Sequence, residues 1–561
     1  MLNVQDPRVA RMAADLKNLD GMTRLDLAAS IVGKSTRWLA GVNTQYNSAF
    51  GLVKLTRDTW GGLVNLNSTR LRGRGLKVLA DVPKAMVGIG WGLFKERHAS
   101  LDPSALEWSR LWQQFQADGG RTGYRDLFTR AEERALQIER ELRAAGPANA
   151  WLVAKRAGRW LLNLLDGFNM ALENAVRLAA YKEAIDRGMA RPEAARLGRE
   201  LTVDFNRKGR SGRELSPLYA FFNASVQGGA RTIQTLKGEN GRAIIAGGLT
   251  LGVIQALLLL AAGYDDDEIP EFVKSRSLII PLPKDAKGEK RFLQVPYPLG
   301  LHVLPNTGRV LTELGLSGGR DLSKKVVGAI GELASAFNPL GGGDVTTMHG
   351  VLTTAPTVVD PLIDVMANQN FAGQPIEREA FRGELDNRPG FARVRERTQR
   401  ELIGQAYLEI SKAINAATGG TQYERGLASP TPERVRYIAQ TVGGGVLREL
   451  EKAVNSTHAS LQGDEVKLSG VPVLGRFKGE VNPDRVTQNR YWERSKVLDK
   501  LQSSMTAAKN AGDAEALVRL GEKPEARMIR AHDQMQRKLA QLNRLAVSVV
   551  NDPMPNIIQR H

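Results

Sequence analysis

The chain has 561 residues and no cysteine, and 78 Lys and Arg stand against 60 Asp and Glu, a formal net charge of +18. The lack of cysteine excludes a disulfide scaffold, a zinc–thiolate site, an iron–sulfur cluster and a cysteine nucleophile. Hydrophobic residues at 42% and charged residues at 25% exclude wholesale disorder. The excess of positive charge indicates nucleic acid or an anionic membrane surface as a partner, with a generally basic proteome as the alternative explanation.

The first half of the chain predicts helix after helix. Its opening residues are charged throughout and lack the apolar stretch of a signal peptide, and apolar spacing indicates a first helix after Asp6-Pro7. Further helices are expected at 25–39 and 150–188, and residues 128–142 carry apolar side chains at the 3,4 spacing of a short heptad seam. Because two heptads are too few for a coiled coil, packing inside a helix bundle is the simpler interpretation.

Residues 243–263 read AIIAGGLTLGVIQALLLLAAG, without a single charge. At about 1.5 Å per residue such a helix is roughly 31 Å long, which matches a hydrocarbon core of about 30 Å. Its Leu, Ile and Val residues favour insertion and its glycines, Thr250 and Gln255 oppose it, so a membrane span and a wholly buried helix both remain open. Gly248 and Gly252 form a GxxxG pair that would allow another helix to approach closely. The candidate membrane-helix residues are Ala243, Gly248, Gly252, Leu257, Leu260 and Gly263.

An acidic run, Asp265 to Glu268, follows this helix. It lacks the spacing of a calcium loop, so a solvated acidic cap is favoured over a cation site. Two short β-like runs, 278–282 and 291–296, then predict a hairpin whose prolines indicate edge strands. From 311 to 475 we expect short helices interrupted by glycines and prolines, among them Gly443-Gly444-Gly445.

The C-terminal residues return to long helices. Apolar residues recur there with helical spacing, which predicts a stripe that faces the core and a solvated basic back. The stripe consists of Met528, Ala531, Met535, Leu539, Leu542, Ala546 and Val549. The fold expected is therefore mainly α, an extended multi-helix bundle with a small Pro-flanked β-hairpin and one long apolar helix. Its five regions are 1–100 (N-terminal helices), 101–240 (helical bundle), 241–310 (apolar helix and hairpin), 311–480 (Gly/Pro-interrupted helices) and 481–561 (C-terminal helices).

No motif for catalysis is found. The six histidines form no HExxH pair, and neither a phosphate-binding GxxxxGK[ST] loop nor a GxSxG elbow is present. We therefore expect no enzyme activity, and no catalytic, cofactor or metal residue is assigned.

Residues 204–228 contain a specific sequence signature, which is more informative than the spacing of residue types. It reads DFNRKG at 204–209 and, after a basic linker, YAFFNASVQG at 219–228. This signature resembles the large polyvalent-protein-associated domain family of phages and conjugative elements, and also the C-terminal part of the largest internal core proteins of short-tailed phages. The resemblance extends over most of residues 40–460. The signature residues are Asp204, Phe205, Asn206, Arg207, Lys208, Gly209, Tyr219, Phe221, Phe222, Asn223, Gln227 and Gly228. Capping by Asp204 or Asn206 and core packing by the two phenylalanines are the simpler roles for them.

The resemblance implies an internal virion protein that is packaged with the genome and ejected into the host cell envelope. Such a protein would oligomerise, contact other internal or portal proteins and non-specific DNA, engage the host membrane, and help to form a DNA-conducting channel. The alternative is a soluble module of a mobile-element polyvalent protein that accompanies and protects incoming DNA. Many relatives carry an N-terminal peptidoglycan-cleaving module; none is recognisable here, so lytic activity is not carried over.

Overall fold

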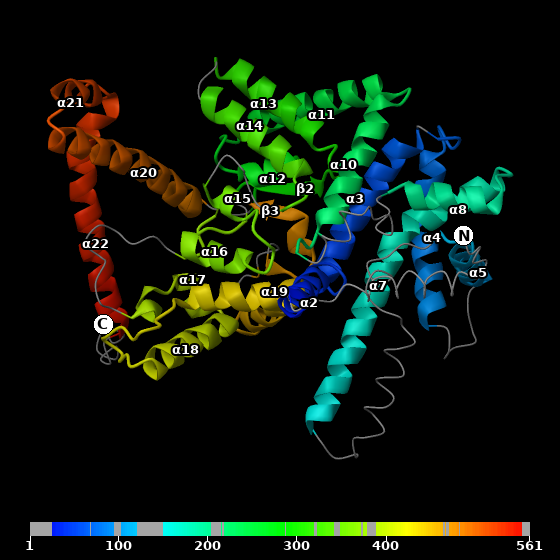
Figure 1. The fold of residues 1–561 in the computed structure, drawn as a ribbon, viewed down its shortest axis with the longest axis horizontal. Coiled ribbons are helices and arrows are strands. Elements are labelled where there is room, and N and C mark those ends of the chain that lie inside the picture. The colour runs from blue at the N-terminus through cyan, green and yellow to red at the C-terminus, as the bar shows by residue number, and fades with distance from the viewer. Residues whose placement is uncertain are drawn as a thin grey trace.

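The computed structural model describes residues 25–67, 69–94, 103–120, 150–202, 215, 218–285, 288–318, 322–341, 348–371, 374–377, 389–463, 466, 470–481 and 483–551. The mainly helical fold is confirmed, with one small antiparallel sheet and one long apolar helix (Figure 1). The expected first helix, the heptad seam at 128–142 and the signature residues 204–209 lie outside these described residues.

The N-terminal helices enclose the larger of the two apolar cores. They are α2 (Leu25–Asn43), α3 (Ser48–Leu66), α4 (Gly75–Phe94), α5 (Pro103–Ala117), α7 (Ala150–Asp186) and α8 (Arg191–Glu200). Trp108, Trp112 and Phe115 of α5 pack on Leu178 and Tyr181 of α7, which is the long helix expected at 150–188. Burial of such aromatic side chains contributes to the stability of this bundle.

The central part holds the sheet. Its elements are α10 (Phe222–Lys237), α11 (Gly241–Ala261), α12 (Glu271–Arg276), β1 (Ser277–Leu282), β2 (Arg291–Pro296), α13 (Val303–Leu316) and α14 (Leu322–Phe337). The predicted hairpin is confirmed, with Ile280 paired to Leu293. A third strand, β3 (Lys478–Glu480), adds to β2, so β2 is the central strand and not the edge strand that its proline suggested. Pro296 is tolerated because it is the last residue of β2, beyond the register shared with β3.

The remaining helices follow in two groups. The first comprises α15 (Met348–Leu352), α16 (Asp360–Ala367), the 3₁₀ helix Gly390–Arg393, α17 (Glu396–Arg400), α18 (Leu402–Ala417), α19 (Pro432–Leu461) and the 3₁₀ helix Leu474–Arg476. The second is a C-terminal arm of α20 (Pro483–Asn510), α21 (Ala514–Gly521), the 3₁₀ helix Pro524–Met528 and α22 (Ile529–Asn551), which stands apart at the left of Figure 1.

The break predicted at the glycine triplet 443–445 is confirmed as a kink inside α19. At Gly444 the backbone leaves the helical conformation, with a φ of 59° and a ψ of −147° that suit glycine alone, so two helical segments meet there. A Cβ at Gly444 would lie 2.6 Å from backbone atoms of Val42, so the kink lets α19 lie directly against α2.

Candidate membrane helix and its charged base

Helix α11 is the predicted apolar segment, displaced by two residues at each end from the expected 243–263. Its end is set by Gly263, whose φ of 72° is left-handed. The Gly263 N–H donates to Leu260 O at 2.9 Å and the Tyr264 N–H to Leu259 O at 3.0 Å, the hydrogen-bond pair of a Schellman motif. Among the described residues, α11 is the one helix long and apolar enough to cross a bilayer by length and composition.

The GxxxG pair of α11 is used inside the protein. A Cβ at Gly248 would lie 2.7 Å from Leu304 Cβ, and one at Gly252 would overlap the carbonyl oxygen of Pro305. Reciprocally, a Cβ at Gly308 of α13 would overlap the carbonyl oxygen of Leu249. The close helix approach predicted from the sequence is therefore confirmed, and its partner is α13.

The inner face of α11 carries small residues and one amide. Gln255 is 1% exposed; it accepts from the Tyr297 hydroxyl at 2.6 Å and donates to Lys274 O at 3.3 Å. Ala256 is buried beside it, and Leu259 enters the small core that Ile279 and Phe292 of the sheet complete. The amide is paired on both sides, so its burial carries no desolvation penalty that would drive α11 from the body.

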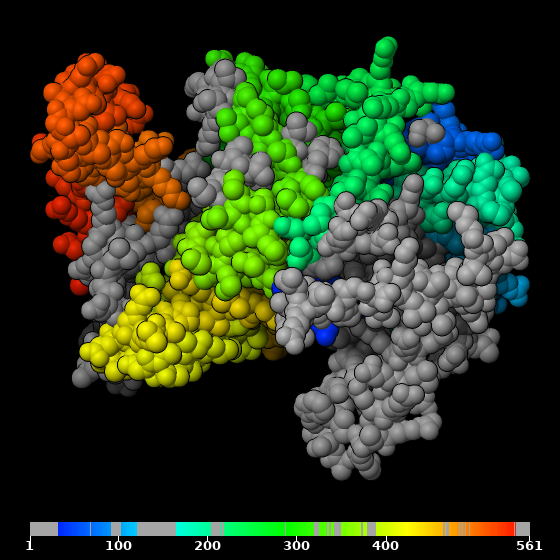
Figure 2. Space-filling model, in the orientation of Figure 1, coloured from blue at the N-terminus to red at the C-terminus, as the bar shows by residue number. Residues whose placement is uncertain are grey.

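The outer face of α11 carries large aliphatic side chains. Ile254, Leu257, Leu258 and Leu260 are 46%, 46%, 43% and 56% exposed, and Val253 is 37% exposed. In the space-filling view α11 lies along the upper edge of the molecule (Figure 2). Of the candidate membrane-helix residues, Ala243, Leu257, Leu260 and Gly263 are exposed, whereas Gly248 is half-buried and Gly252 fully buried against α13.

Asp265, Asp266 and Asp267 after α11 are exposed, as the predicted solvated cap requires, but their carboxylates are also ion-paired. Arg490 at the root of α20 pairs with both Asp265 and Asp267, and Lys290 pairs with Glu268 at 2.6 Å. Asp266 accepts from Lys274 at 2.7 Å and pairs with Lys325 at 3.0 Å. Burial alone would raise the pKa of Asp266, but Lys274 and Lys325 outweigh it and lower the pKa. The run is thus a junction that fastens the end of α11 to α12, β2, α14 and the arm.

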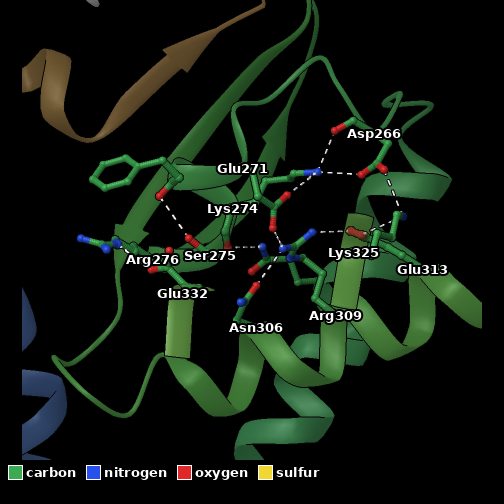
Figure 3. A network of polar contacts seen from close by, with 12 residues as sticks. Asp266, Glu271, Lys274, Ser275, Arg276, Asn306, Arg309, Glu313, Lys325 and Glu332 are labelled. Atoms are coloured by element: carbon green, nitrogen blue, oxygen red, sulfur yellow. Dashed lines mark hydrogen bonds and ion pairs between the residues drawn. The ribbon is translucent and has the colours of Figure 1, made fainter. Parts of the chain in front are cut away.

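Beneath this junction lies a second charged centre on α13 (Figure 3). Arg309 is 1% exposed, pairs with Glu313 at 2.7 Å and with Glu271, and donates to Asn306 Oδ1 at 2.7 Å. Burial would lower the pKa of Arg309, and the carboxylates of Glu271 and Glu313 more than offset it and raise the pKa. The guanidinium stays charged and holds α12 against α13.

A cavity of about 380 Å³ lies between α11, α13 and this junction. The charged residues that line it include Asp266, Lys274, Glu313 and Lys325, which pair with one another. Within the described part of the chain no group of His, Asp and Glu is arranged to hold a metal ion. The paired charges therefore stabilise the fold around α11.

The second half of the signature forms the start of α10. Phe222 and Gly228 are buried, Phe221 is 44% exposed, and Tyr219, Asn223 and Gln227 are half-buried. The preceding turn is tied to residue 357, where the Ala220 N–H donates to Thr357 Oγ1 at 3.2 Å. Only one of the two phenylalanines has the core role expected for both.

Sequence reasoning missed the residues that fix α11 in place. Arg309, Lys325 and Arg490 bind carboxylates on other elements, and no local sequence pattern predicts such ion pairs. Arg309 and Glu313 within the otherwise uncharged 303–316 were the one available signal, because charges in such a helix are retained when they are paired.

Comparison with protein families supports the resemblance seen in the signature. Residues 264–474 match the model of large polyvalent protein associated domain 38, so the chain resembles that family over this range. The matched range begins just after α11 and contains the acidic junction, the sheet strands β1 and β2, and Arg309; the signature precedes it. Comparisons with curated proteins and with solved structures gave no match.

The fold and the matched range together define a helical, polyvalent-protein-associated module.

Proposed function

We propose that the protein is a phage internal virion protein, ejected with the genome, that oligomerises and helps to form a DNA-conducting channel across the host cell envelope. It would lie in the virion interior and then in the envelope, with other internal or portal proteins, non-specific DNA and the host membrane as partners. It would act by assembly and membrane contact, without catalytic turnover. The polyvalent-protein-associated domain and the charge of +18 support this proposal.

The observation that carries the membrane contact is the distribution of side-chain size around α11. Large aliphatic residues such as Ile254 and Leu257 point outward, and Gly252, Gln255 and Ala256 point inward. A helix that served only as core would place its large residues inside, because burial of a Leu or Ile side chain contributes about 1.5–3 kcal/mol. The outer face of α11 is therefore suited to a second apolar environment, and its length suits a bilayer.

Co-flotation of the full chain with neutral phosphatidylcholine vesicles tests this contact. The variant Ile254→Asn/Leu257→Asn changes two outward side chains and spares Leu259, whose burial in the core makes it unsuitable as a probe. The matched control is Leu427→Asn/Leu461→Asn, which removes two leucines that are 96% and 82% exposed outside α11.

Wild type and control are expected to float, and the α11 variant to remain at the bottom of the gradient. If wild-type protein stays at the bottom, or if the α11 variant floats as well as the control, the membrane proposal is wrong. The alternative of a soluble module of a polyvalent protein that accompanies and protects incoming DNA then becomes the better account, supported by the family match and the net charge.

A further inference from the structure

Helix α22 carries a second exposed apolar surface, far along the chain from α11. Within the C-terminal arm, α22 packs on α20 through Ser495, His532 and Gln536, with Leu498 and Ala540 beside them. Gln536 Nε2 donates to Ser495 Oγ at 2.8 Å, and His532 Nε2 lies 3.1 Å from the same oxygen. The face of α22 that the arm uses is thus the one centred on His532 and Gln536.

The stripe predicted to face the core lies beside this seam and is exposed. Met528 just before α22 is 54% exposed, Met535 is 45% exposed and Leu542 is 61% exposed, and Ala531 is exposed between them. Their spacing of seven residues places them on one side of the helix over about four turns. For Met528, Ala531, Met535 and Leu542 the prediction of a core-facing stripe is wrong, because polar His532 and Gln536, which were not part of the pattern, occupy the seam. The other members of the predicted stripe are Leu539, which is half-buried, and Ala546 and Val549, whose side chains lie outside the described part of the chain.

The flank opposite this stripe is basic. Arg530 and Arg537 are exposed and lie on the same side of α22, separated by Gln534, and Lys538 is exposed next to them. The acidic residue of α22, Asp533, accepts a hydrogen bond from Gln502 of α20 at 3.1 Å and so is turned toward the arm. An exposed apolar stripe on one side and exposed cations on the opposite side are the pattern of helices that lie in the plane of a membrane interface.

We propose that α22 binds anionic lipid surfaces. Lying in the interface, it places Met535 and Leu542 at the acyl boundary and its arginines among anionic headgroups. Pairing with a second copy of α22 through the stripe would leave the cations without an anionic partner, and a DNA backbone would leave the apolar stripe in water; an anionic bilayer satisfies both surfaces at once. This contact does not depend on α11.

Vesicle binding by the full chain tests the proposal in the Ile254→Asn/Leu257→Asn background, which removes the α11 contact. Vesicles of phosphatidylcholine are compared with vesicles that contain one quarter phosphatidylglycerol. We expect binding to the anionic vesicles alone, reduced about fivefold per arginine in Arg530→Gln/Arg537→Gln and at least tenfold in Met535→Gln/Leu542→Gln. Lys509→Gln/Arg519→Gln, which removes two exposed cations of the same arm outside α22, is expected to change binding less than twofold.

Because the chain has no cysteine, one introduced cysteine can carry an environment-sensitive fluorophore. A blue shift on anionic vesicles is expected for a label at Leu542→Cys and not for one at Gln534→Cys on the polar flank. The proposal is overturned if neither label shifts, or if the arginine variant loses DNA affinity while its vesicle binding is unchanged, which would assign the basic flank to DNA. It is also overturned if Met535→Gln/Leu542→Gln reduces the sedimented mass and leaves vesicle binding intact, which would assign the stripe to self-association.

Discussion

The crossing of α11 and α13 makes a sharp prediction about two glycines of one helix. Gly247 and Gly252 lie five residues apart in α11, and alanine improves the helix propensity of either by about 1 kcal/mol. A Cβ at Gly247 meets nothing within 4 Å, whereas one at Gly252 would lie 2.6 Å from Arg309 N and 2.8 Å from Pro305 C. These are backbone atoms, so a rotamer change cannot relieve the contact.

Relief requires α11 and α13 to separate by about 1 Å, which forfeits a quarter to a half of the dispersion energy at the crossing. Overpacking of this kind costs about 1–3 kcal/mol. We therefore expect Gly247→Ala to stabilise by about 0.5–1 kcal/mol and Gly252→Ala to destabilise by about 1–2 kcal/mol, net of propensity. With an unfolding entropy of about 2.1 cal/mol/K per residue over the whole chain, the two variants should then differ in melting temperature by about 2 °C.

Thermal unfolding followed by circular dichroism measures this difference, and hydrogen exchange of α11 and α13 peptides locates it. Gly308→Ala, which meets α11 from the other side, should behave like Gly252→Ala. Equal melting temperatures for Gly247→Ala and Gly252→Ala would refute the interlocked crossing.

Three further predictions address the rest of the fold. Arg309→Met should lower the free energy of unfolding by about 3 kcal/mol, because Glu271 and Glu313 lose their shared cation. The double variant Arg309→Met/Glu313→Leu should recover part of this loss, and unfolding free energies that are fully additive over the two substitutions would contradict the pairing. Burial, with Arg276 and Arg57 nearby, lowers the pKa of His302 to about 3, and the nearby carboxylate of Glu332 is already paired with Arg276 at 2.7 Å. His302 is therefore neutral in the folded protein, and unfolding takes up a proton when the pH is below the unfolded-state pKa of about 6.5. Stability should fall by about 2 kcal/mol between pH 6.5 and pH 5, and a pH series on His302→Gln with the same slope would contradict this. Gly444→Ala should cost about 2 kcal/mol or more through its backbone conformation and its contact with Val42, whereas Gly328→Ala, which meets nothing within 4 Å, should not destabilise; equal unfolding curves would count against the kink.

Sequence patterns predicted the elements whose signals are local. The apolar helix α11, the hairpin of β1 and β2, and the long helix α7 follow from apolar spacing and turn residues within a single segment. Patterns failed where the partner lies far along the chain. Strand β3 pairs with β2 and makes it the central strand, and Arg490 pairs with Asp265 and Asp267. The local sequence around β2 or around the two aspartates predicts neither contact.

The candidate membrane helix shows why hydrophobicity alone left a buried helix and a membrane helix open. Every turn of α11 is apolar, so the amount of hydrophobic surface does not distinguish its two faces. Residue size does: Gly248, Gly252 and Ala256 recur every four residues on the side that meets α13, while Ile254, Leu257 and Leu258 fill the opposite side. Four-residue spacing of small residues marks a face that approaches another backbone, and large aliphatics on the remaining surface bury area only if something else covers them. The two environments, membrane and protein core, are therefore alternatives for two faces of a single helix. The four-residue spacing of small residues in α11 already indicates that its inner face packs against protein.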